Sequence, residues 1–129
     1  MHPKNLHKNG YPMDTLCQTY PALKSFLVRA KSGNTSIDFT SPKAVKVLNA
    51  ALLHHYYRLE YWDIPDGYLC PPVPGRADYI HGIADLLKST SSSAQGEQSQ
   101  QGKVQNVRGL DIGVGANAIY PIIGVTTYD

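Results

Sequence analysis

One segment of the sequence, residues 110–117, has the residue types and spacing of a ligand-binding turn. It reads Leu-Asp-Ile-Gly-Val-Gly-Ala-Asn, so an apolar stretch runs into a Gly-x-Gly turn at Gly113 and Gly115. Glycine lets a backbone turn sharply and approach a ligand closely, because no Cβ intrudes. In open α/β sheets, ligands bind at such turns, at the carboxyl ends of strands. A tight turn without a ligand explains the residues equally well, since the third glycine of a dinucleotide fingerprint is replaced by Ala118.

A second segment, residues 70–76, ends in an arginine that could hold an anion. It reads Cys-Pro-Pro-Val-Pro-Gly-Arg, and its prolines favour a stiff, extended backbone leading to Arg76. A guanidinium held in this way can grip a carboxylate or a phosphate with two parallel hydrogen bonds. The alternative, which these residues alone favour, is a proline-rich loop with a surface ion pair from Arg76 to Asp78 or Asp85.

The remaining polar and aromatic residues give weaker signals. His54 and His55 are adjacent, so on a helix they would point about 100° apart, and the sequence predicts no metal site. No Ser/His/Asp arrangement and no pair of acids marks a catalytic centre. A cluster of aromatic side chains could stack on bases, but packing in the core is the better interpretation. Its members are Tyr56, Tyr57, Tyr61, Trp62 and Tyr68.

Two helices should frame the segment that leads to Arg76. Ser41 is the expected N-cap of the first, because its hydroxyl can accept an amide hydrogen bond from the first turn. Apolar residues recur at helical spacing from there to about residue 60, and again over residues 77–88. Between the two helices, four prolines exclude regular structure until Gly75.

Shorter elements are predicted around these helices. Asp14 should cap a short helix that follows an irregular arm, and Pro21 should start another helix that ends before the turn at residues 32–34. Residues 89–102 are rich in Ser, Gln and Gly and have nothing large to bury, which predicts a flexible linker. Strands are expected at residues 36–39 and 104–112, and a further segment at 118–125.

Composition and charge limit the class of protein. The chain has 129 residues, and no apolar run approaches the ~18–20 residues of a membrane span. Without a secretory signal, Cys17 and Cys70 are expected to be free thiols in a reducing cytoplasm. Residues 1–46 hold seven Lys or Arg against two Asp, a net charge of +5, whereas residues 47–129 hold five against eight, a net charge of −3. A basic front end suits a polyanion such as RNA, but ordinary solvated lysines are the explanation that charge alone favours.

Several blocks of the sequence occur together in a familiar order. They read MHPKN at residues 1–5, SIDF at 36–39, PxAVxxLN at 42–49, WDIPDGYLCPPVPGRADYIH at 62–81 and LDIGVGANAIYP at 110–121. Together they closely resemble the N-terminal part of the bacterial large-subunit ribosomal RNA adenine-N6 methyltransferases. Eukaryotic relatives of that family methylate adenines in small nuclear and messenger RNA.

The resemblance implies an α/β fold, with a helical N-terminal extension leading into the first strand-turn-helix of a truncated Rossmann-like class I methyltransferase fold. It divides the chain into an RNA-facing helical extension over residues 1–88, a flexible linker over 89–103, and the start of an S-adenosylmethionine-binding domain over 104–129. The implied partner is large-subunit ribosomal RNA in the cytoplasm, with no membrane and no metal.

The resemblance also implies which residues meet the cofactor, S-adenosyl-L-methionine, and the RNA. Arg76 should lie beside the glycine turn and contact the cofactor together with Asp111, Gly113, Gly115 and Asn117. The RNA-binding candidates lie in the basic arm and are His2, Lys4, Asn5 and Lys8. The arm reads Lys4-Asn5-Leu6 where relatives read Arg-Asn-Arg, which removes part of the expected RNA contact.

The family's catalytic signature, Asn-Pro-Pro-Phe, does not occur in the sequence. The resemblance therefore predicts no catalytic residue in this chain and no activity of the chain by itself. The predicted function is the front portion of an enzyme that methylates the N6 of an adenine. The alternatives are a non-catalytic RNA-binding helical module and a truncated gene product.

Overall fold

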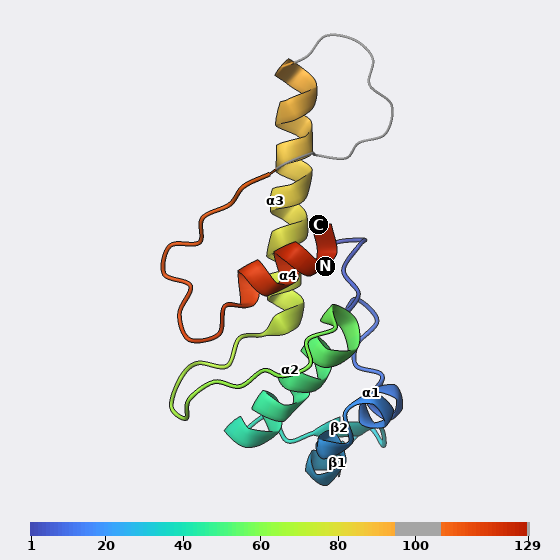
Figure 1. Cartoon of the computed structure of the whole chain (residues 1–129). Helices are drawn as coiled ribbons and strands as arrows, with labels where there is room; N and C mark the ends of the chain where they lie inside the picture. The colour runs from blue at the N-terminus through green and yellow to red at the C-terminus, as the bar shows by residue number, and fades with distance from the viewer. Residues whose placement is uncertain (95–106, 129) are drawn as a thin grey trace.

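A computed structural model describes residues 1–94 and 107–128, with the backbone only for 91–94. The described part is mostly helical with one small antiparallel sheet. Its elements are α1 (Met13–Thr19), the 3-10 helix η1 (Pro21–Phe26), β1 (Leu27–Arg29), β2 (Thr35–Ile37), α2 (Pro42–Tyr57), α3 (Val73–Ala94) and α4 (Ile119–Tyr128). Figure 1 shows α4 lying against the long helix α3, while α1 and the β1–β2 hairpin lie beyond α2 at the opposite end of the molecule. In the described residues, no helix has the length and apolar content that crossing a membrane requires.

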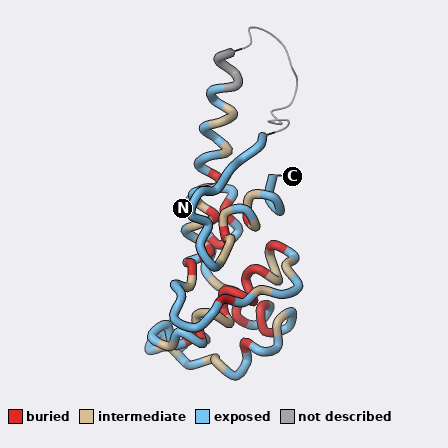
Figure 2. Tube along the Cα trace, turned by 60° about the vertical axis from the view of Figure 1, so that its left-hand side comes forward, coloured by how far each residue is buried: buried red, intermediate tan, exposed pale blue. Residues whose placement is uncertain are grey.

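The buried core centres on α2. Leu52 and Leu53 of this helix are fully buried, and so are Leu16 of α1, Leu23 of η1 and Ile123 of α4. Figure 2 shows that the buried residues follow the middle of the molecule, where these elements meet. Cys17 is buried and Cys70 is half-buried, and both are free thiols as predicted.

The start of α2 confirms the predicted cap. The hydroxyl of Ser41 accepts a hydrogen bond from the amide of Ala44 at 3.4 Å. The helix ends at Tyr57, a little before the predicted residue 60, because Arg58 adopts a left-handed conformation (φ 55°) and its amide closes the helix on the carbonyl of Leu53.

Replacing Ser41 by Ala is expected to lower the free energy of unfolding by about 1 kcal/mol, because the amide of Ala44 loses its partner. Urea denaturation followed by circular dichroism measures this change. Ser32→Ala in the exposed hairpin turn is the matched control and should change stability by less than about 0.5 kcal/mol. Equal effects of the two substitutions would show that the cap contributes nothing specific.

The front of the chain differs from the prediction in two places. Residues 1–12 form an irregular arm as predicted, but Asp14 does not cap α1; Pro12 holds the cap position, and Asp14 lies in the first turn. The helix expected from Pro21 ends at Phe26, and the chain continues as β1. Gly33, with φ 85°, allows the chain to fold back. The backbone of β1 therefore forms hydrogen bonds with β2 instead of continuing the helix.

Helix α3 is longer than predicted at both ends. It starts at Val73 instead of residue 77, since Pro74 suits the first turn of a helix. It continues to Ala94, so the first part of the predicted linker is helical, and the helix rises beyond the body of the molecule (Figure 1). The rest of the predicted linker, residues 95–103, lies outside the described residues.

The strand predicted at 104–112 is not formed in its described part, residues 107–112. A strand exists through hydrogen bonds to a neighbour, and the one sheet among the described residues is β1–β2. The apolar side chains therefore face solvent, with Leu110 and Ile112 86% and 88% exposed. The helical extension is observed, whereas a Rossmann-like sheet remains a prediction.

Candidate functional site

The glycine turn at residues 111–117 takes the backbone conformation that its glycines predict. Gly113 has φ 82° and Gly115 has φ 66°, values that side-chain-bearing residues rarely adopt. No heavy atom lies within 4 Å of the position that a Cβ would take on either glycine. Asp111 is exposed at the start of the turn. The backbone is thus open to a molecule that approaches it closely.

The end of the turn is fixed where it enters α4. The side-chain oxygen of Asn117 accepts a hydrogen bond from the amide of Ile119 at 3.2 Å, which caps this helix. The carbonyl of Asn117 accepts a second hydrogen bond from the indole N–H of Trp62, also at 3.2 Å. Ile119 and Ile123 are buried and anchor α4 in the core. Asn117 therefore has a structural role at the base of the turn.

Arg76, in the first turn of α3, lies against the first turn of α4. Its Nη1 donates a hydrogen bond to the hydroxyl of Tyr120 at 2.6 Å, and its Cζ lies 5.3 Å from the centre of the Tyr120 ring. Tyr120 follows the glycine turn closely in the chain, so the structure brings Arg76 to the helix into which that turn runs. The ion pairs to Asp78 and Asp85 that were the alternative are not formed, because both carboxylates bind the arm instead.

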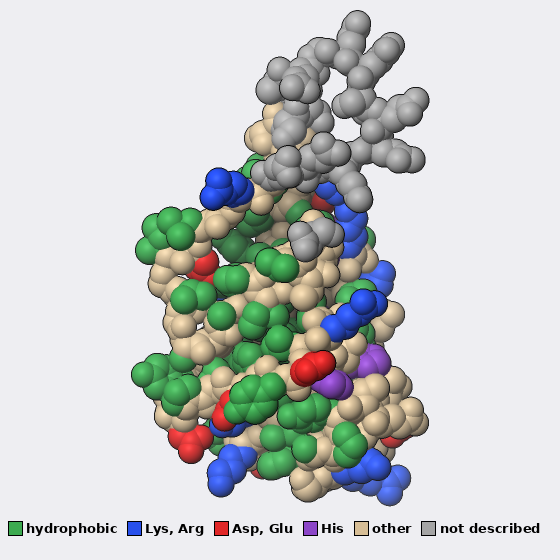
Figure 3. Space-filling model, in the orientation of Figure 1, with side chains coloured by type: hydrophobic (Ala, Val, Ile, Leu, Met, Phe, Trp, Pro, Cys, Tyr) green, Lys and Arg blue, Asp and Glu red, His purple; other side chains and the backbone are tan. Residues whose placement is uncertain are grey.

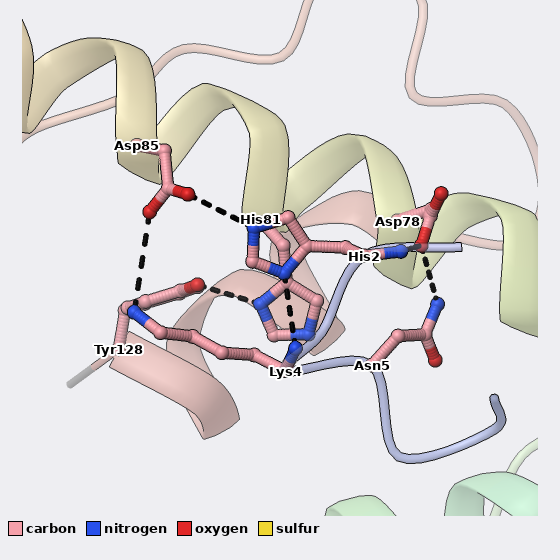
Figure 4. Close-up of polar contacts among 7 residues, drawn as sticks. All are labelled: His2, Lys4, Asn5, Asp78, His81, Asp85 and Tyr128. Atoms are coloured by element: carbon pink, nitrogen blue, oxygen red, sulfur yellow. Dashed lines mark hydrogen bonds and ion pairs between the residues drawn. The ribbon is translucent and has the colours of Figure 1, made fainter.

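The arm is held on α3 by two carboxylates, as Figure 4 shows. Asp78 accepts hydrogen bonds from the backbone amide of His2 at 2.5 Å and from the side-chain amide of Asn5 at 2.9 Å. Asp85 pairs with the ring of His2 at 2.9 Å and with Lys4 at 3.9 Å. The hydrogen bonds from Asn5 and His2 keep the pKa of Asp78 below its usual value, and the hydrogen bond from His2 does the same for the pKa of Asp85.

The placement of Asn5 corrects the prediction that its side chain faces RNA. Asn5 is 1% exposed, and its amide also donates a hydrogen bond to the carbonyl of Pro74 at 2.9 Å. Its side-chain oxygen accepts a hydrogen bond from the amide of His7 at 2.9 Å. With every polar atom bonded inside the chain, Asn5 fastens the arm to α3, whereas its neighbours Lys4 and Lys8 are exposed.

Two further histidines pack where the arm meets the helices. His81 stacks on His2, with ring centres 5.0 Å apart, and its Nδ1 lies 2.6 Å from the hydroxyl of Tyr128. His7 is buried, and its Nε2 lies 2.9 Å from the hydroxyl of Tyr57. Burial lowers the pKa of His7 to about 4, assisted by the positive charge of His81. Within the described ranges, no group of three or more His, Cys, Asp or Glu residues is placed to hold a metal ion.

The predicted aromatic cluster divides into two parts. Tyr57 is buried and Trp62 packs against the core, whereas Tyr61 and Tyr68 are 80% and 61% exposed. The roles of Trp62 and Tyr120 beside the candidate site were missed by the sequence analysis. The position of Tyr120, shortly after the glycine turn, was the one feature of the sequence that pointed to it. Its partner Arg76 lies far away in the chain.

The whole chain, residues 1–129, matches a family model described as RNA methyltransferase. Among curated proteins, it is 62% identical over 128 residues to ribosomal RNA large subunit methyltransferase F of Pseudoalteromonas atlantica, covering 99% of this chain and 37% of that protein. The protein of the same name in Salmonella paratyphi B is 53% identical over 128 residues, with 99% and 39% covered. The chain thus spans less than two fifths of the length of these relatives.

Solved structures give the same match. The METTL16 MTase domain superposes with a TM-score of 0.78 at 35% identity, covering 98% of this chain and 45% of that one. The N-terminal domain of human METTL16 in complex with SAH gives the same identity, TM-score and coverage. The match over the entire chain and the conserved arrangement of its helices establish that this chain belongs to the RNA methyltransferase family.

Proposed function

We propose that the chain is the front portion of an enzyme that transfers a methyl group from S-adenosyl-L-methionine to the N6 of an adenine in large-subunit ribosomal RNA. The observation that carries this proposal is the 62% identity, across 99% of the chain, to a protein named ribosomal RNA large subunit methyltransferase F. In this proposal residues 1–88 form the RNA-facing extension and 104–129 the start of a Rossmann-like cofactor domain. Of the linker predicted between them, residues 89–94 belong to α3. The reaction takes place in the cytoplasm.

The open glycine turn and Arg76 form the cofactor site in this proposal. At Gly113 and Gly115 the cofactor can come close to the backbone of the turn. The turn is flanked by Asp111, which is exposed, and Asn117, which is half-exposed. Only one nitrogen of the Arg76 guanidinium is engaged, by Tyr120, and its other N–H groups have no partner among the described residues. A planar, permanently charged donor with free N–H groups suits the carboxylate at the methionine end of the cofactor.

When bound, the cofactor would supply an activated methyl group: the amino nitrogen of an extruded adenine takes the methyl as the sulfonium C–S bond breaks, S-adenosylhomocysteine is left, and the amino group loses a proton. The residues of this chain bind and orient the cofactor. The glycine turn holds one face of the cofactor, and Arg76 fixes its carboxylate end, so that the two reactants meet in a productive geometry.

The docked arm provides the RNA contacts of this proposal. On the face shown in Figure 3, Lys and Arg side chains are spread over the surface rather than gathered in one patch. Lys4 and Lys8 are exposed, His2 is half-exposed, and Asn5 keeps them in place. The ammonium of Lys8 donates a hydrogen bond to the carbonyl of Pro3 at 2.9 Å, and that of Lys4 lies 3.9 Å from Asp85. In this proposal both exposed side chains exchange these contacts for phosphates, which needs no reading of the base sequence.

Replacing both Lys4 and Lys8 by Ala should weaken RNA binding and make it less sensitive to salt. Each lysine that neutralises a phosphate releases a counterion, so the slope of log K against log salt should become shallower by about 1.4 to 1.8 for the two lysines. Fluorescence anisotropy with a labelled ribosomal RNA fragment between low and moderate salt measures the slope. The control is Lys24→Ala with Lys43→Ala, which removes the same charge from η1 and α2. An unchanged slope in the arm variant would show that the arm is structural only.

Isothermal titration calorimetry tests the cofactor part of the proposal. S-adenosylhomocysteine, the demethylated product, is titrated into the chain, with adenosine and methionine titrated separately. We expect saturable one-to-one binding of S-adenosylhomocysteine and weaker binding of either half, because the site spans both. Equal binding of adenosine and S-adenosylhomocysteine would contradict a role for Arg76 at the carboxylate, and no binding of either would contradict the proposed site.

A further inference from the structure

The candidate cofactor turn is fixed by a side chain from outside it. Trp62 lies between α2 and α3, packs half-buried against the core, and donates its indole N–H to the carbonyl of Asn117 at 3.2 Å. Gly113 and Gly115 have no heavy atom near their Cβ positions, so the turn has little packing of its own. Its conformation therefore depends on its end at Asn117, where the cap of α4 and the bond from Trp62 meet.

The guanidinium of Arg76 is fixed in a comparable way. Tyr120 contacts it twice, through the 2.6 Å hydrogen bond to its hydroxyl and through its ring, 5.3 Å from Cζ. The ring of Tyr120 is itself packed on Tyr79, with centres 5.1 Å apart. A free arginine side chain samples many rotamers, and ordering it on ligand binding costs about 1.5–2 kcal/mol of conformational entropy. A tyrosine that orders it beforehand removes part of that cost.

We infer that Trp62 and Tyr120 are positioning residues for cofactor binding, Trp62 for the glycine turn and Tyr120 for the guanidinium of Arg76. The inference rests on the proposed function, since the turn and Arg76 are the proposed cofactor site. Neither residue needs to touch the cofactor: each holds a group that does. Loss of either contact should weaken cofactor binding while leaving the core of α1, η1 and α2 intact.

Two conservative substitutions separate these contacts from packing. Trp62→Phe keeps an aromatic ring but removes the indole N–H, and Tyr120→Phe keeps the ring over Arg76 but removes the hydroxyl. The matched control is Tyr61→Phe, next to Trp62 and 80% exposed. We expect the dissociation constant for S-adenosylhomocysteine, measured by calorimetry on folded protein, to rise about threefold to tenfold in each variant and to change less than twofold in the control.

A second measurement needs no cofactor. In ligand-free protein, the ¹⁵N heteronuclear NOE of the Gly113 and Gly115 amides should fall in Trp62→Phe. The ¹⁵N heteronuclear NOE of the Arg76 side-chain Nε–H should fall in Tyr120→Phe. Neither should change in Tyr61→Phe. Unchanged NOEs in both variants would overturn the inference. Wild-type protein that binds no S-adenosylhomocysteine would count against the proposed function, while the NOE comparison would still decide whether these residues hold the turn and the arginine.

Discussion

Lowering the pH from 7 to 4 is expected to reduce the free energy of unfolding by roughly 3 kcal/mol through His7 alone. The pKa of His7 is about 4 in the folded chain, against 6.5 for an ordinary histidine. As the pH falls, the unfolded chain takes up a proton near pH 6.5 and the folded chain does not until about pH 4. Stability is therefore complete above pH 6.5 and is lost between these values, at ~1.4 kcal/mol for each unit of difference between the two pKa values.

The surroundings of His7 explain the low pKa. The ring is 2% exposed, packs edge-on against Tyr56 with centres 4.8 Å apart, and meets the hydroxyl of Tyr57. Its Nδ1 is buried and has no hydrogen-bond partner among the described residues. A charged imidazolium would lose its hydration there without gaining a carboxylate. Burial also lowers the pKa of His81, which adds to the loss in the same direction.

Urea denaturation at pH values between 7 and 4 measures this effect. His7→Gln keeps a polar side chain near Tyr57 without an imidazole. The free energy of unfolding of this variant should depend on pH less steeply, because unfolding then takes up as much as one proton fewer over this range. Lys8→Gln is the control in the same arm and should retain the wild-type dependence. A wild-type stability that stays constant between pH 6.5 and 4.5 would show that His7 is not buried as a neutral group.

Replacing Arg76 by Ala is expected to weaken binding of S-adenosylhomocysteine by about 1.5–3 kcal/mol, or about 10-fold to 150-fold, the usual range for a hydrogen bond to a charged group. Arg76→Lys should recover only part of this loss, because a point charge cannot make a two-pronged contact with a carboxylate. The effect should exceed that of Tyr120→Phe, which leaves the guanidinium in place. Calorimetry at constant salt gives each dissociation constant.

Arg29→Ala is the matched control for Arg76→Ala. Arg29 lies on β1 in the hairpin and is exposed, so its replacement makes the same change in net charge without touching α3 or α4. It should change the dissociation constant less than twofold. Equal losses in the two variants would mean that the cofactor responds to overall charge, and an unchanged constant in Arg76→Ala would remove Arg76 from the site.

The sequence predicted the elements whose signals are local. The cap at Ser41 and the apolar spacing after it located α2, and the glycines of residues 113 and 115 predicted the turn. The strand β1 was missed because three residues form a strand only when a partner lies beside them. The apolar residues at 107–112 were wrongly predicted to be a strand, because an apolar pattern does not show whether a partner strand is present.

The contacts around the candidate site could not be predicted from spacing. Asn5 was assigned to RNA because it lies in a basic arm, but its burial depends on how that arm docks on α3. Arg76 was placed near the glycine turn by family resemblance, and its contact with Tyr120 joins residues that are distant in the chain. Trp62 was one of several aromatic residues until the structure connected it to Asn117.

The most direct test of the proposed cofactor site is a titration of S-adenosylhomocysteine into the chain, followed by ¹H–¹⁵N NMR. Glycine amides, the arginine side chain and the indole N–H resonate apart from most other signals, and Trp62 is the one tryptophan of the sequence, so its indole signal needs no further assignment. If the glycine turn and Arg76 bind the cofactor, the signals of Gly113, Gly115, the Arg76 side chain and the Trp62 indole will shift saturably. Saturable shifts confined to residues of α1, η1 or the hairpin, with these four signals unmoved, would contradict it.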